Sequence, residues 1–262
     1  MTSMANHTIP TGWTLISLRP QGQHAVLRRA IAPLGGAVLG LSPWRLQRLQ
    51  GVAVEQRLNQ ALACARVVFT SPAAVDAAAA LRPLAGTQQG PWLTVGEGTA
   101  RALHAQGIAD VHAPQRMDSE GLLGLPVLAD VRGMDIGLVT APGGRGLIAA
   151  QLQDAGARIV RADVYQRVPL RLSRRNLARL AHSATPWLLA VSSGEALQRF
   201  WQSLSPGWQQ QLRAHAIVLA ASDRLAEQAQ ALGLQRVVRS EGPTVAQLTA
   251  AAHAALTAPA AT

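Results

Sequence analysis

Short apolar runs alternate along the whole chain with segments that carry leucine and alanine at three- and four-residue spacing. The runs predict buried strands, and the spacing between them predicts helices with one apolar face. The ten predicted strands are Thr14–Leu18, Ala37–Leu41, Arg66–Thr70, Trp92–Val95, Val111–Ala113, Ile136–Thr140, Arg158–Ala162, Trp187–Val191, Ala216–Ala221 and Arg236–Val238. The predicted helices include His24–Leu34, Thr99–Gln106, Leu147–Asp154 and Arg224–Leu232. This alternation is typical of an α/β fold with parallel sheets.

The two halves of the chain repeat one another. Matching positions lie 121 to 126 residues apart, and several are glycines suited to the left-handed residue that ends a helix. The pairs are Pro20 with Pro142, Gly35 with Gly156, Thr70-Ser71 with Ser192-Ser193, and Gly107 with Gly233. We therefore expect two homologous halves, over residues 13–126 and 136–252.

Each half supplies five predicted strands, which suits two doubly wound parallel sheets. Pro43 and Pro169 are candidate points at which the chain crosses from one sheet to the other, and the charges divide near the same places. Residues 46–165 hold ten arginines against ten acidic residues, whereas the rest of the chain holds fourteen against four. We predict a discontinuous, basic domain over residues 1–43 and 169–262, and a continuous, charge-neutral domain over residues 46–165.

The net charge of +10 is carried by arginine alone, because the sequence contains no lysine. A basic face favours an anionic partner, either nucleic acid or a small molecule with several carboxylates or phosphates. Only two Phe and one Tyr are present, and no recognisable zinc-finger, RNA-recognition or helix-turn-helix signature occurs. We therefore expect no nucleic-acid partner. Three of the six tryptophans, Trp13, Trp92 and Trp187, begin predicted strands and are expected to pack in the core.

The location expected from the sequence is the cytoplasm. The first ten residues lack the basic and apolar regions of a signal peptide, and no run approaches the roughly 20 apolar residues that cross a bilayer. The only cysteine, Cys64, lies in an apolar stretch and is expected to be a buried thiol rather than a nucleophile. A reducing compartment and no membrane contact fit these features.

Hydroxyl groups, glycines and arginines follow the predicted strands, where the strands end. In parallel sheets, ligands bind beyond these carboxyl ends. The candidate ligand-binding residues there are Ser17, Arg19, Thr70, Ser71, Thr99, Arg145, Ser192, Ser193 and Ser222. Any one of these hydroxyl groups could instead be a helix N-cap. The glycine-rich turns match no complete nucleotide-binding motif, and no metal-ligand or nucleophile-elbow motif is present.

Seven segments carry a resemblance to a known family. They are Leu15–Gly22, Val68–Val75, Val95–Ala100, Asp118–Leu123, Gly143–Arg145, Val164–Arg167 and Ser192–Leu197. In this order and spacing they resemble the uroporphyrinogen-III synthase family along nearly the whole chain. The resemblance implies two flavodoxin-like α/β domains joined by a two-stranded linker, with the active site in the cleft between them. It also implies a carbon–oxygen lyase that removes water from hydroxymethylbilane and closes the ring with the last pyrrole inverted, without metal or cofactor.

The same resemblance implies roles for single residues. Tyr165 aligns with a tyrosine proposed to assist departure of the substrate hydroxyl, and Thr99 with a threonine of the cleft. Ser71, Ser192 and Ser193 align with hydroxyl groups near the carboxylate arms of the substrate. The second glycine-threonine turn of the family is replaced by Ser222–Leu225, which leaves open whether Ser222 or Arg224 binds substrate.

The partner implied is the small-molecule substrate, and we expect a monomer. A transient contact with hydroxymethylbilane synthase, the preceding enzyme, is left open. The alternative hypothesis is a cytosolic two-domain binding or regulatory protein for an anionic small molecule, because fold alone does not determine function. The ordered set of turn motifs favours the enzyme.

Overall fold

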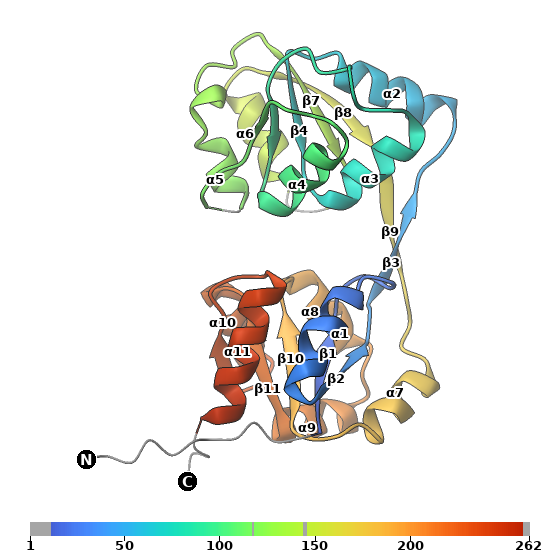
Figure 1. The fold of residues 1–262 in the computed structure, drawn as a ribbon, viewed down its shortest axis with the longest axis vertical. Coiled ribbons are helices and arrows are strands. Elements are labelled where there is room, and N and C mark those ends of the chain that lie inside the picture. Colours follow the sequence, from blue (N-terminus) through green and yellow to red (C-terminus); the bar gives the residue numbers. More distant parts are fainter. Residues whose placement is uncertain (1–11, 117, 144–145, 259–262) are drawn as a thin grey trace, which may run out of the picture. The chain divides into compact units, whose positions relative to one another are not determined.

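The computed structural model describes residues 12–116, 118–143 and 146–258. The chain forms two compact units, which are coloured by sequence in Figure 1. Unit 1 combines Met1–Arg45 with Pro169–Thr262, and unit 2 is the continuous segment Leu46–Val168. Unit 1 contains thirteen arginines against four acidic residues, and unit 2 eleven against ten. Nearly all of the excess positive charge therefore belongs to unit 1.

The sheet of unit 1 has five parallel strands in the order β12-β11-β10-β1-β2. The strands are β1 (Trp13–Ser17), β2 (Gly36–Gly40), β10 (Trp187–Val191), β11 (Ala216–Ala220) and β12 (Val237–Arg239). The helices are α1 (Ala25–Ile31), η1 (Ala32–Leu34), α7 (Arg174–Ala181), α8 (Gly194–Gln202), α9 (Pro206–His215), α10 (Asp223–Ala231) and α11 (Val245–Thr257). Every residue of β1, β10 and β11 is buried. Because successive side chains point to opposite faces, helices must cover both faces of this sheet.

The sheet of unit 2 also has five parallel strands, in the order β6-β5-β4-β7-β8. The strands are β4 (Arg66–Phe69), β5 (Trp92–Thr94), β6 (Val111–His112), β7 (Asp135–Thr140) and β8 (Arg158–Asp163). The helices are α2 (Val52–Leu62), α3 (Pro72–Leu81), α4 (Glu97–Ala105), α5 (Ser119–Leu123), η2 (Pro126–Leu128) and α6 (Leu147–Asp154). Phe69 and Val139 pack on one side of the sheet, whereas Val68 and Leu138 pack on the other. Unit 2 is therefore covered on both faces as well.

The internal repeat explains why the two sheets share one spatial order. Each half of the chain places its first two strands in one sheet and its last three in the other. The order β2-β1-β10-β11-β12 in unit 1 thus corresponds to β8-β7-β4-β5-β6 in unit 2. The strand left over from each half, β3 (Trp44–Arg48) or β9 (Tyr165–Pro169), pairs with the other as a two-stranded sheet. The fold class implied by the resemblance is confirmed.

The ten predicted strands all form, with ends that differ by one residue at most. The apolar pattern alone did not predict β3 and β9, because polar residues interrupt each of these five-residue strands. The glycines predicted to end helices, Gly35, Gly107, Gly156 and Gly233, have φ angles of 74°, 80°, 88° and 85°. These left-handed angles confirm the prediction, since glycine adopts them without strain.

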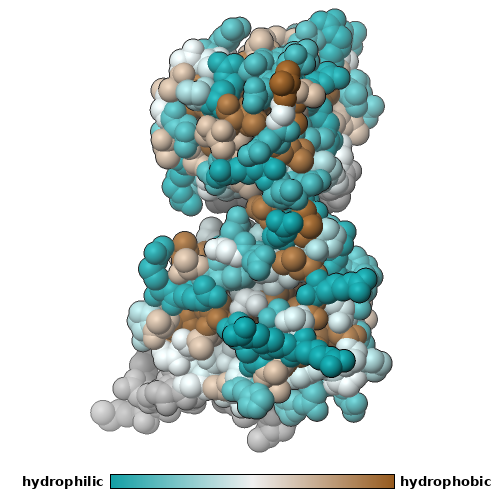
Figure 2. All heavy atoms as spheres, turned by 90° about the vertical axis from the view of Figure 1, so that its right-hand side faces the viewer, coloured by the Kyte–Doolittle hydropathy of each residue, from teal (hydrophilic) through white to brown (hydrophobic). Residues whose placement is uncertain are grey.

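The cores contain the predicted aromatic residues. Trp13 and Trp92 are fully buried, and Trp187 is 6% exposed. Cys64 is buried, and burial raises the pKa of its thiol, which disfavours the reactive thiolate. On the face drawn in Figure 2, hydrophilic residues cover most of the surface. In the part of the chain that the structure describes, only Val26 and Val52 are large apolar residues with high exposure, and no helix is long and apolar enough to cross a membrane.

Candidate functional site

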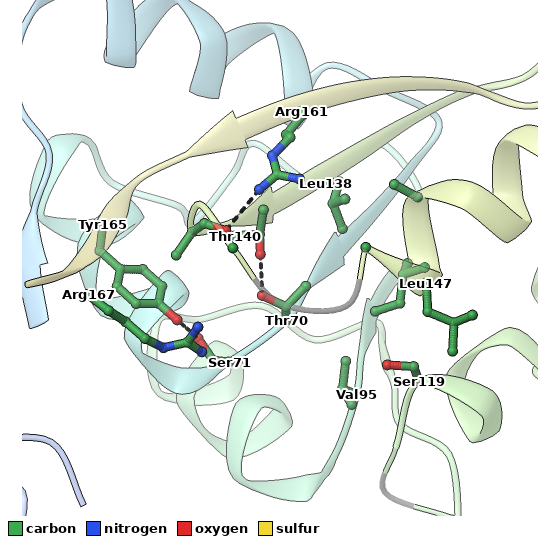
Figure 3. A pocket seen from close by; sticks show the side chains of 15 residues that line it. Thr70, Ser71, Val95, Ser119, Leu138, Thr140, Leu147, Arg161, Tyr165 and Arg167 are labelled. Atoms are coloured by element: carbon green, nitrogen blue, oxygen red, sulfur yellow. Dashed lines mark hydrogen bonds between the residues drawn. The ribbon is translucent and has the colours of Figure 1, made fainter. Parts of the chain in front are cut away.

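A pocket of about 210 Å³ lies in unit 2 at the carboxyl ends of β4 and β7 (Figure 3). The strand order reverses between these two neighbouring strands, because β5 and β6 extend the sheet on one side and β8 on the other. Such a reversal opens a crevice in doubly wound sheets. The pocket is lined by Thr70, Ser71, Val95, Ser119, Leu138, Thr140, Ala141, Gly143, Gly146, Leu147, Ile148, Ala149, Arg161, Tyr165 and Arg167.

A tyrosine and a serine form a hydrogen bond at the wall of this pocket. Tyr165 is the first residue of β9 and only 4% exposed, and its hydroxyl lies 3.0 Å from Ser71 Oγ. Ser71 is the N-cap of α3 and accepts a hydrogen bond from the backbone N–H of Ala74 at 3.2 Å. This cap fixes the position of the serine oxygen. The tyrosine hydroxyl is therefore held by a group that is itself anchored to a helix.

Two threonines form a second pair of hydroxyl groups at the same edge of the sheet. Thr70 directly follows β4, and Thr140 is the last residue of β7. Their Oγ1 atoms lie 2.8 Å apart, beyond the parallel pairing of Phe69 with Val139. Hydroxyl groups both donate and accept hydrogen bonds, so this pair can bind a carboxylate or a neutral polar group.

Two of the described residues that line the pocket are arginines, Arg161 and Arg167. Arg161 Nη2 donates to the Ala141 carbonyl at 2.9 Å, and Arg161 Nε donates to Asp163 Oδ1 at 3.0 Å. Arg167 is exposed, and in Figure 3 its side chain runs beside Tyr165 with the guanidinium near Ser71. Among the described residues that line the pocket there is no Asp or Glu. The pocket therefore suits an anionic ligand.

Unit 1 has a buried histidine at the equivalent edge of its sheet, a feature that sequence reasoning did not predict. His24 is 5% exposed, and its ring nitrogens lie 3.1 Å from Ser17 Oγ and 2.9 Å from Ser42 Oγ. Burial, together with the positive charges of Arg28 and Arg19, lowers the pKa of His24. The neutral imidazole is favoured, with one nitrogen donating and the other accepting.

Comparison with known proteins identifies the family. The family model described as Uroporphyrinogen-III synthase HemD matches residues 26–250. The chain belongs to the uroporphyrinogen-III synthase family. It is 35% identical over 150 residues to the uroporphyrinogen-III synthase of Salmonella typhimurium and 34% identical over 148 residues to that of Escherichia coli. Each alignment covers 56% of this chain and 60% of the relative, so the chain matches less than two thirds of these enzymes.

Solved structures support the fold. A mutant uroporphyrinogen III synthase from the extremely thermophilic bacterium Thermus thermophilus aligns with a TM-score of 0.63 at 16% identity, over 93% of this chain and 98% of that one. The uroporphyrinogen-III synthetase of Helicobacter pylori aligns with a TM-score of 0.61 at 12% identity, over 93% and 99% of the two chains. At these identities the likeness establishes the shared fold.

The structure brings together three of the predicted site residues in unit 2, namely Thr70, Ser71 and Tyr165. Thr99 is not among the residues that line the pocket. It is the third residue of α4, 4% exposed, and the N-cap of that helix is Gly96. The predicted start of this helix at Thr99 is wrong, because α4 begins two residues earlier, at Glu97. Arg145 lies outside the described residues.

The remaining predicted site residues belong to unit 1, at or after the ends of the strands β1, β10 and β11. Ser193 and Ser222 are N-caps of α8 and α10, each accepting a backbone N–H at 3.3 Å. Ser192 is exposed. Ser17 is fully buried, and Arg19 Nη2 donates to the Pro243 carbonyl at 3.2 Å. Burial lowers the pKa of Arg19.

Sequence reasoning missed Ser119, Thr140, Arg161 and Arg167 as pocket residues. Thr140 was predicted as the end of a strand, but its counterpart in the repeat, Leu18, is apolar and gave no signal of a binding role. Arg161 carried a usable signal, because an arginine inside a predicted buried strand is rarely placed there without a partner. The described residues contain no group of three or more His, Cys, Asp or Glu side chains arranged to hold a metal ion.

Proposed function

We propose that this chain catalyses the uroporphyrinogen-III synthase reaction, the dehydration and cyclisation of hydroxymethylbilane with inversion of the last pyrrole ring. Family membership supports the activity. The hydrogen-bonded pair of Tyr165 and Ser71 at the pocket wall is the observation that supports this pocket as the active site. Action as a monomer in the cytoplasm, expected from the sequence, is part of the same proposal.

One of the two directions open to the Tyr165–Ser71 hydrogen bond leaves a proton for the substrate. Ser71 Oγ accepts from the Ala74 N–H, so the serine hydroxyl proton is available to Tyr165 Oη. With that oxygen accepting from Ser71, the phenolic proton of Tyr165 can point into the pocket. There it donates a hydrogen bond and then its proton to the departing hydroxyl group, which leaves the bilane as water. The tyrosinate regains the proton that the bilane releases on ring closure. Charge that develops on the departing oxygen is stabilised by a donor already in place.

The larger contribution of the protein is to hold the substrate in one folded geometry. The hydroxyl group of the bilane departs readily, and unassisted closure gives the isomer without ring inversion. An enzyme therefore has to favour one orientation of the last ring, which is a matter of positioning. The arginines and hydroxyl groups of the pocket can bind the acetate and propionate arms for this purpose.

The experiment is to supply hydroxymethylbilane to the purified, chelator-treated protein without any added cofactor and to identify the uroporphyrin isomers after oxidation. We expect the type III isomer at a rate well above spontaneous closure. Formation of the type I isomer alone, at the spontaneous rate, would refute the proposal. Tight binding of hydroxymethylbilane without any turnover would point instead to a binding or regulatory protein.

A further inference from the structure

The pocket at the carboxyl ends of β4 and β7 is small compared with the proposed substrate. Its volume is about 210 Å³. Pockets that enclose drug-sized ligands occupy roughly 300–1,000 Å³. A linear chain of four substituted pyrroles is larger than such a ligand, so it cannot fit inside. Only part of the substrate, such as one pyrrole ring with its two acid arms, can therefore occupy this pocket.

The two arginines of the pocket are placed for different tasks. Arg161 forms an ion pair with Asp163 at 3.0 Å and donates to the Ala141 carbonyl, so it mainly holds the loop after β7 against β8. Arg167 belongs to β9 and is exposed, and its guanidinium extends along the Tyr165 ring towards Ser71 (Figure 3). Arg167 is thus the residue that brings positive charge to the wall formed by Ser71 and Tyr165, on a side chain that a ligand can reach.

We infer that the pocket is a subsite for a single pyrrole ring that carries two carboxylate arms, and that Arg167 binds one of those arms beside the Tyr165 hydroxyl. The identity of the ring as part of a bilane rests on the proposed function, whereas the preference for a dicarboxylate rests on the pocket itself. The planar guanidinium offers two parallel N–H donors that match the two oxygens of a carboxylate. The hydroxyl groups of Thr70 and Thr140 lie on another part of the same wall.

Binding of one arm by Arg167 has a consequence for specificity. A ring held by one carboxylate on Arg167 and by the pocket walls has fewer orientations in which an edge faces the tyrosine hydroxyl. Arg167 is then a specificity-determining residue, which favours one orientation of the bound ring. A lysine at this position keeps the charge and loses the two-pronged geometry, so it should restore only part of the binding.

The test uses the full-length protein and two probes, a monopyrrole with one acetate and one propionate arm, and the diamide of the same pyrrole. Binding is measured by calorimetry or by ligand-observed NMR at constant ionic strength. Four proteins are compared: the parent chain, Arg167→Gln, Arg167→Lys and Arg132→Gln. Arg132 is the matched control, because it is exposed and precedes β7, at the opposite edge of the same sheet.

We expect the parent chain to bind the diacid about tenfold more tightly than the diamide, since a hydrogen bond to a charged group contributes about that factor. Arg167→Gln should lose that factor for the diacid and leave the diamide unchanged. Arg167→Lys should fall between the two, and Arg132→Gln should match the parent. A merely structural role of Arg167 predicts equal losses for both probes, and that result overturns the inference, as does equal binding of diacid and diamide by the parent.

The synthase assay on the same preparations separates this inference from the proposed function. Selective binding of the diacid without any type III product supports the subsite and refutes the proposed activity. Type III product from a parent chain that binds neither probe, even at millimolar concentration, supports the activity and overturns the subsite.

Discussion

Replacing Tyr165 by phenylalanine removes one hydroxyl group and little else. The ring is 4% exposed and packs in the core cluster on one face of the sheet of unit 2. Phenylalanine keeps that packing. Ser71 loses a partner at 3.0 Å but still accepts from Ala74, so its cap of α3 survives. The free energy of unfolding should fall by only about 1 kcal/mol, the usual net contribution of one hydrogen bond.

The rate should fall further than the stability. One donor aimed at a developing negative charge contributes about 3 kcal/mol, which corresponds to a roughly hundredfold lower rate of type III synthesis. Activity should nevertheless remain measurable, because positioning of the substrate arms does not depend on this hydroxyl. The rate is measured with hydroxymethylbilane, and the free energy of unfolding by urea denaturation of the same preparation.

Ser71→Ala tests whether the serine acts through the tyrosine. The single variant should lose part of the rate and about 1 kcal/mol of stability with the cap. In the double variant with Tyr165→Phe, the rate should equal that of Tyr165→Phe alone, because no hydroxyl remains for Ser71 to orient. Ser173→Ala is the matched control, since Ser173 caps α7 in the same way, at 3.1 Å from the Asn176 N–H. It should lose stability without losing rate.

Two results would refute this reasoning. Complete loss of activity in a folded Tyr165→Phe protein would make the tyrosine a single essential acid rather than one contributor among several. Rate losses of Tyr165→Phe and Ser71→Ala that multiply in the double variant would show that the two hydroxyl groups act independently, despite the 3.0 Å contact between them.

Three further predictions concern stability and charge. Thr99→Phe should destabilise the protein by about 1–3 kcal/mol through overpacking, because Thr99 is buried in α4; a stable variant with a selective loss of rate, by urea denaturation and synthase assay, would contradict this. Between Ser17 and Ser42, His24 has a lowered pKa and so binds fewer protons in the folded state. Its stabilising contribution should be complete above about pH 6.5 and decline as the pH falls towards the lower folded pKa. Urea titrations across that range should show a weaker pH dependence in His24→Gln. Finally, kcat/KM for hydroxymethylbilane should fall as salt is raised, since exposed arginines attract a polyanion through a field screened within about 10 Å at 0.1 M; a flat salt profile would exclude this steering.

Local patterns in the sequence determined much of this protein. The central strands of the two five-stranded sheets could be predicted because a strand buried on both faces must be almost continuously apolar. The edge strands could be predicted from shorter apolar runs between turn residues. The glycines that end helices could be predicted from the left-handed angle that such an end requires. The repeat and the uneven distribution of arginine could be counted directly. Each of these properties is a matter of composition, of spacing between matching positions, or of neighbours within a few residues along the chain.

The tertiary structure decided what depends on distant parts of the chain. Ser71 and Tyr165 lie 94 residues apart in sequence, and their contact exists only because the end of β4 and the start of β9 lie at the same pocket. Likewise, Arg161 donates a hydrogen bond to the carbonyl of Ala141, and that residue belongs to the loop after the neighbouring strand β7. The sequence also placed Thr99 among the candidate hydroxyl groups, since a threonine beside glycines suits a helix N-terminus. Only the fold revealed that α4 begins earlier and buries this side chain, because burial is set by the packing of α4 against α3 and not by the residues beside Thr99.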